Sequence, residues 1–142
     1  MIQLKVRTEY SFGQTYAPIP RVIERLKAIG CTAAGIVDTD TWGHAKWQAA
    51  CDDAGIQPLF GTECVVTADD TPLRMWFLTR DLKELYGWTS KSFHQRLQTR
   101  TGAIPRLYPH DVEKMTENIF KFAGEMRSEE RRVGKECLRL CR

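Results

Sequence analysis

Two hydrophobic patterns alternate along the first 80 residues, and this alternation limits the folds that the chain can form. Short apolar runs typical of strands are separated by segments in which apolar residues recur at helical spacing. The strand-like runs span residues 2–7, 31–38, 56–67 and 72–79, and the helical segments span residues 18–30 and 41–55. Because the connections are short, successive strands should be parallel and joined by right-handed crossovers. The pattern predicts an α/β fold, either an open doubly wound sheet or an incomplete barrel.

The two helical segments carry recognisable start and stop signals. Pro20 suits the first turn of the helix over 18–30, and Gly30 is expected to end it. Gly55 is expected to terminate the second helix. The predicted buried face of that second helix consists of Trp42, Ala45, Ala49 and Ala50.

The rest of the chain gives a less regular pattern. The strand-like run over 56–67 is expected to be interrupted at "FGTE". Residues 80–99 predict two short helical stretches, and residues 103–118 predict a turn followed by another helix. Residues 119–126 can begin one more strand.

Polar residues lie at the carboxyl ends of the predicted strands. In both architectures, active sites form at the carboxyl ends of parallel strands. These residues are Lys5, Arg7, Glu9, Asp38, Asp40 and Glu63. Lys5 and Arg7 lie on one face of the first strand, because side chains alternate along an extended chain. Two adjacent cations at the end of a strand therefore require an explanation.

Bulk composition excludes some functional classes. The chain is 42% hydrophobic and 27% charged, and it has no apolar run long enough to span a membrane. It shows no secretory signal at its start, so we expect a cytoplasmic protein with reduced cysteines. Its net charge of +3 comes entirely from residues 127–142, with six basic and three acidic side chains, so residues 1–126 are neutral. Bulk charge therefore gives no evidence of nucleic-acid binding.

The last segment, "RSEERRVGKECLRLCR", has no apolar periodicity. It resembles the translation of a sequencing adapter, so we expect residues 127–142 to be a disordered tail foreign to the fold. Residues 1–126 would then be a partial domain. The alternative is a genuine basic tail on a stand-alone interaction protein.

Three segments together resemble the start of the PHP (polymerase and histidinol phosphatase) domain. They are "LKVRTEYS", "GCTAAGIVDTDTWGHAKWQAACDDAGIQPLFGTE" and "FLTRDLKELYGWTS". The version at the N-terminus of bacterial-type or phage-type DNA polymerase III alpha subunits is the most similar. The resemblance implies the first half of a seven-stranded (βα) barrel, with parallel strands alternating with helices.

In active members of this family, histidines and carboxylates bind up to three metal ions that hydrolyse phosphoesters. The resemblance places Lys5 and Arg7 where such members carry a His-x-His pair. Asp38 matches the acidic member of an Asp-His pair, and Thr39 replaces its histidine.

Two further positions complete this half of the site. Glu63 matches a bridging carboxylate, and Arg74 stands where another histidine is expected. Because cations repel Zn²⁺, Mn²⁺ and Mg²⁺, we predict a degenerate site with no metal and no other cofactor. In this site Lys5 and Arg7 should form salt bridges with Asp38 and Glu63.

Two other interpretations of these residues stay open. A metal site rebuilt around Asp38, Glu63, Asp40 and His44, with Glu9 nearby, would make the chain a phosphoesterase or exonuclease. Otherwise His44 is expected to be a surface residue or a helix-start residue, and Cys64 a buried thiol.

The resemblance also implies partners. An intact polymerase would act on DNA and deoxynucleotides, and its PHP domain would be a scaffold or a docking surface for a proofreading exonuclease. The chain by itself should have no polymerase activity. Its uncovered sheet edges could let it self-associate.

Overall fold

The computed structural model describes residues 1–11, 15–69, 71–99 and 102–123. Its main sheet has the strand order β1 (Ile2–Val6), β2 (Ala33–Asp38), β3 (Gln57–Ala68), β4 (Thr71–Thr79) and β8 (Ile119–Ala123), and β7 (Arg106–Leu107) pairs with β3 beside this path. The tail predicted for residues 127–142 lies outside the described residues.

The first part of the sheet is parallel, as predicted. β1 (Ile2–Val6) pairs with β2 (Ala33–Asp38), and β2 pairs with β3 (Gln57–Ala68), both in parallel. The crossovers contain α1 (Ile19–Ala28) and α2 (His44–Ala54). Pro20 lies in the first turn of α1, and Gly55 ends α2 with a left-handed φ of 67°, a conformation that glycine adopts without steric cost.

The second part of the sheet corrects the prediction of parallel strands throughout. β4 (Thr71–Thr79) is antiparallel to β3, and β8 (Ile119–Ala123) is antiparallel to β4. The physical reason is the connection: only two residues separate β3 from β4, whereas a parallel neighbour needs a crossover of a dozen or more. The sheet is therefore mixed, and it curls into part of a barrel.

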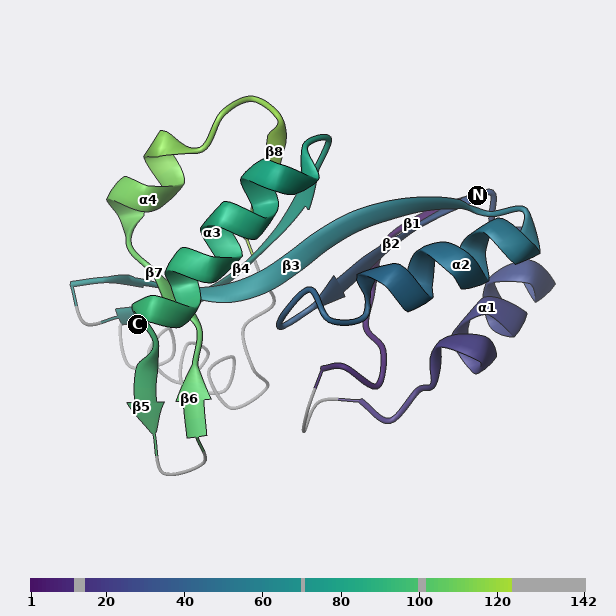
Figure 1. The fold of residues 1–142 in the computed structure, drawn as a ribbon, viewed down its shortest axis with the longest axis horizontal. Helices are drawn as coiled ribbons and strands as arrows, with labels where there is room; N and C mark the ends of the chain where they lie inside the picture. The colour runs from purple at the N-terminus through teal and green to yellow at the C-terminus, as the bar shows by residue number, and fades with distance from the viewer. Residues whose placement is uncertain (12–14, 70, 100–101, 124–142) are drawn as a thin grey trace, which may run out of the picture.

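β3 is more regular than predicted, since it runs unbroken through "FGTE". Gly61 makes this possible, because a Cβ atom there would lie 2.1 Å from the carbonyl oxygen of Phe77 on β4. In Figure 1, β3 extends across the molecule, with α1 and α2 beside one end and α3 (Leu82–His94) and α4 (Pro109–Lys114) beside the other.

The remaining elements follow residue 80. A single helix, α3 (Leu82–His94), replaces the two predicted stretches, and the Asp81 side chain caps it by accepting hydrogen bonds from the N–H groups of Lys83 and Glu84. A small hairpin of β5 (Leu97–Thr99) and β6 (Gly102–Ile104) was not predicted. β7 (Arg106–Leu107) and α4 (Pro109–Lys114) precede β8. None of the described helices is long and apolar enough to cross a membrane.

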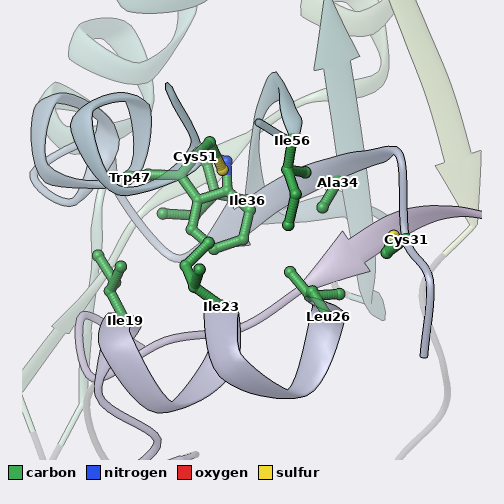
Figure 2. Packing of buried hydrophobic residues seen from close by; sticks show 9 residues of the cluster. All are labelled: Ile19, Ile23, Leu26, Cys31, Ala34, Ile36, Trp47, Cys51 and Ile56. Atoms are coloured by element: carbon green, nitrogen blue, oxygen red, sulfur yellow. The ribbon is translucent and has the colours of Figure 1, made fainter. Parts of the chain in front are cut away.

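Two hydrophobic clusters hold the helices against the sheet. Figure 2 shows the first, in which Ile19, Ile23 and Leu26 of α1 point toward Trp47 of α2 and Ile36 of β2. The second lies under α3 and consists of Cys64, Val66, Phe77, Leu85, Leu107, Met115 and Ile119. Burial raises the pKa of the Cys64 thiol to about 12, which fits an inert packing role.

The predicted buried face of the second helix is wrong at three of its four positions, since only Ala50 packs against the first cluster. Trp42 precedes α2 and its side chain is 68% exposed, and Ala45 and Ala49 also face solvent. The buried residues are instead His44, Trp47 and Cys51. Because the helix begins at His44, spacings of three and four residues from that start select this other face.

Candidate functional site: a cation cluster around Glu63

The strands bring three cations to one carboxylate on the sheet face away from the helices. Val6 packs against the first hydrophobic cluster, so its neighbours Lys5 and Arg7 point to the opposite face. Cys64 likewise belongs to the second cluster, so Glu63 points away from α3. The site therefore forms on the face of the sheet opposite the helices.

Lys5, Arg7 and Arg74 all contact the carboxylate of Glu63. Lys5 Nζ lies 3.3 Å from Glu63 Oε2, and Arg7 Nη2 donates a short hydrogen bond to the same oxygen. Arg74 Nη1 donates to Glu63 Oε1 over 3.1 Å. The Glu63 side chain is only 3% exposed, so all three cations lie around a carboxylate almost sealed from water.

Burial and charge act in opposite directions on Glu63. Burial raises the pKa of its carboxyl group, but the hydrogen bond from Arg7 and the charges of Arg7 and Lys5 outweigh it. The net result is a pKa below the usual value of 4.5. Glu63 is therefore ionised at neutral pH.

Arg74 joins this cluster because of the antiparallel hairpin. Glu63 pairs with Trp76 across β3 and β4, and Arg74 lies two residues away on the same face of β4. The sequence singled out Arg74 as a former ligand position but did not include it among the salt bridges. Only the register of the hairpin shows that it reaches Glu63.

Asp38 has a different environment from the one predicted. Its carboxylate accepts hydrogen bonds from the backbone N–H of Thr8 (2.8 Å), the hydroxyl of Thr8 (2.6 Å) and the hydroxyl of Ser11. No ion pair to Asp38 occurs among the described residues. The predicted salt bridge from Lys5 or Arg7 to Asp38 is therefore wrong, because the loop after β1 folds over Asp38 and supplies neutral donors.

Thr8 and Ser11 are thus site residues that the sequence analysis missed. The segment "TEYS" entered the prediction only as part of the family resemblance, although hydroxyl groups that follow a strand are suited to bond a buried carboxylate. Thr39, the position next to Asp38, is half-buried directly after β2.

The residues considered for a rebuilt metal site each have other partners. Glu9 accepts hydrogen bonds from Lys46 Nζ (2.8 Å) and from the N–H of Ile19 (2.7 Å). Asp40 accepts one from the N–H of Trp42 over 2.9 Å. Within the described ranges, no group of three or more histidine, cysteine, aspartate or glutamate side chains is placed to hold a metal ion.

His44 is the first residue of α2, as one of its two expected roles required, but it is not a surface residue, since its side chain is buried. Its Nε2 lies 2.9 Å from the carbonyl oxygen of Gly61, which can only accept, so Nε2 carries the proton. Burial lowers the pKa of His44, although the Gly61 carbonyl and the charge of Asp38 act against this. Burial raises the pKa of Asp40, and its contact with the Trp42 N–H partly opposes that rise.

Comparisons with known proteins agree with this fold. The chain is 26% identical over 103 residues to the DNA polymerase III subunit alpha of Streptococcus pyogenes. This match covers 72% of the chain but only 9% of that much longer relative.

Two solved structures share the fold at lower identity. One is a putative metal-dependent phosphoesterase from Bifidobacterium adolescentis, with a TM-score of 0.52 at 18% identity over 68% of this chain and 35% of that one. The other is an amidohydrolase from Chromobacterium violaceum, with a TM-score of 0.55 at 24% identity over 66% of this chain and 33% of that one. These likenesses concern the fold alone. The family model for the PHP domain matches residues 3–133, and together with the curled sheet and the position of the cluster this shows that the chain belongs to the PHP domain family.

Proposed function

We propose that the chain is the PHP region of a DNA polymerase III alpha-like protein in which an ion-pair cluster has replaced the metal site. The observation that carries this proposal is the triple contact of Lys5, Arg7 and Arg74 with Glu63. In an active family member the corresponding positions would supply metal ligands.

The residues present do not fit a metal centre. A divalent cation needs carboxylate or imidazole donors with available lone pairs. Both oxygens of Glu63 already accept from cations, and both oxygens of Asp38 accept from Thr8 and Ser11. Two positive side chains in place of imidazoles would also repel the ion.

Without a metal, the cluster acts as a structural link. Lys5 and Arg7 come from β1 and its end, Glu63 from β3 and Arg74 from β4, so their ion pairs join three strands of one sheet. A PHP domain stabilised in this way would serve the longer polymerase as a scaffold or as a docking surface for a proofreading exonuclease. DNA and deoxynucleotides would be handled by other regions of that protein, in the cytoplasm.

Metal analysis of the purified protein tests the proposal. After incubation with Zn²⁺, Mn²⁺ or Mg²⁺ and removal of unbound ions, we expect less than a stoichiometric amount of any metal. The double substitution Lys5→His with Arg7→His should then gain Zn²⁺ binding, because it restores two imidazoles beside Glu63.

The matched control is Arg21→His with Lys83→His, which adds the same two imidazoles at exposed sites on α1 and α3. This control should gain no stoichiometric metal. Bound metal in the unaltered protein, together with metal-dependent hydrolysis of a phosphoester, would replace the proposal with the phosphoesterase alternative.

A further inference from the structure

The cluster around Glu63 carries more positive than negative charge. Three cationic side chains share one carboxylate, which leaves a surplus of two positive charges on this face of the sheet. The side chains of Lys5, Arg7 and Arg74 are 20%, 32% and 23% exposed, whereas that of Glu63 is 3% exposed. The negative charge is therefore buried beneath, and the positive charge faces solvent.

Among the residues that the structure describes, no carboxylate other than Glu63 forms an ion pair with these cations. Glu9 pairs with Lys46, and Asp38 accepts its hydrogen bonds from Thr8 and Ser11. A site with this charge pattern attracts anions, because the low dielectric constant of the protein beneath the cations strengthens their electrostatic field at the surface.

The two arginines also keep hydrogen-bond donors available. A guanidinium has five N–H groups. In the described part of the chain, Arg7 and Arg74 each contact Glu63 through one terminal nitrogen, and no other acceptor is found for their side chains. Each arginine therefore keeps N–H groups beyond its contact with Glu63, and both side chains are partly exposed beside the same carboxylate.

Two stacked aromatic rings restrict the motion of the Lys5 side chain, the third cation. Lys5 Nζ lies 5.5 Å from the centre of the Trp76 ring, which stacks on Phe122 with ring centres 4.0 Å apart. A side chain held by both a carboxylate and an aromatic face loses little further freedom when an anion binds.

We infer that Lys5, Arg7 and Arg74 form a binding site for a phosphate group that needs no metal. A phosphate dianion matches the surplus of two charges, and its several oxygens suit the arginine N–H groups in the paired geometry that these side chains prefer. A carboxylate ligand would balance only half of this charge. The inference rests on the proposed absence of metal at this site.

The test is a titration of the chain with inorganic phosphate at low ionic strength in the presence of EDTA. The arginine Nε–H signals in a ¹⁵N NMR spectrum report binding, and chloride at the same ionic strength is the reference. We expect phosphate to shift the signals of Arg7 and Arg74, and Arg74→Gln to weaken the affinity about tenfold.

Two further variants give opposite expectations. Arg21→Gln removes the same charge from the exposed side of α1 and should change affinity by less than about twofold. Glu63→Gln removes the competing carboxylate and should bind phosphate more tightly. If Glu63→Gln does not fold, Lys5→Gln takes its place and should weaken binding.

Equal phosphate affinity in Arg74→Gln and Arg21→Gln would overturn the inference, as would shifts no larger than those with chloride. Phosphate binding that appears only when Zn²⁺, Mn²⁺ or Mg²⁺ is added would overturn the proposed metal-free site as well. Absence of both metal binding and phosphate binding would overturn this inference alone.

A parallel titration with an oligothymidylate identifies the source of the phosphate. Tighter binding of the oligonucleotide assigns the site to a nucleic-acid backbone, and tighter binding of inorganic phosphate assigns it to a small phosphate ligand.

Discussion

Asp38 and Glu63 are two buried carboxylates on neighbouring strands, and the protein satisfies them in opposite ways. Asp38 accepts hydrogen bonds from neutral donors of one loop, at Thr8 and Ser11. Glu63 is surrounded by cations from two other strands. The first arrangement binds a local loop to the end of a strand, and the second joins elements that are distant in the sequence.

This difference determines how the partners of each carboxylate are affected when its negative charge is removed. The partners of Asp38 are dipoles, which lose hydrogen bonds but carry no net charge. The partners of Glu63 are cations, which would repel one another without it. Substitutions that remove only the charge should therefore lower the free energy of unfolding by different amounts at Asp38 and Glu63.

The largest effect is expected for Glu63→Gln. It leaves three partly buried cations without a counter-charge, and we expect the free energy of unfolding to fall by about 3 kcal/mol, at the lower end for a broken buried pair because the cations keep some contact with water. Urea denaturation measures it. The control Glu24→Gln, on the exposed side of α1, should change stability by less than about 0.5 kcal/mol.

A smaller effect is expected for Asp38→Asn. The amide keeps one acceptor oxygen but turns its NH₂ group toward Thr8 or Ser11, so at least one hydrogen bond to a buried charge is lost, at a cost of about 2 kcal/mol. The same urea experiment gives the comparison. A loss greater than that of Glu63→Gln would show that the loop contacts, and not the cations, are the main support of this region.

The sequence was sufficient to predict the parallel part of the fold, because each of its elements is periodic and well terminated. The segments over 18–30 and 41–55 became α1 and α2, and Gly55 ends α2 as expected. The strand-helix alternation then required parallel neighbours. The antiparallel part failed for a local reason: the two-residue connection after Ala68 was not interpreted as a hairpin.

The site was only partly predictable for the same reason. Lys5, Arg7 and Glu63 could be placed at one edge of the sheet from strand order alone. Arg74 depends on the register between β3 and β4, and the partners of Asp38 depend on the path of the loop after β1. Hydrophobic periodicity predicts neither the strand register nor the loop path, because tertiary packing determines both.

The smallest effect, a pH dependence, distinguishes the two carboxylates without removing either. The pKa of Glu63 lies below its usual value in the folded protein, so on acidification the unfolded chain takes up this proton first. The stabilisation by ionised Glu63 is therefore complete above pH 4.5 and is lost as the pH falls below that value.

Arg7→Gln removes the hydrogen bond and a charge that lower the pKa of Glu63. We therefore expect the unfolding free energy of this variant to depend less steeply on pH between about pH 5 and 3 than that of the unaltered protein. Asp111, whose pKa is lowered to about 2 against the opposing effect of burial, mainly by its contact with Lys91, adds its own slope equally to both proteins and cancels in the difference. Arg21→Gln should retain the original slope, and an unchanged slope in Arg7→Gln would show that Lys5 and Arg74 alone keep Glu63 ionised.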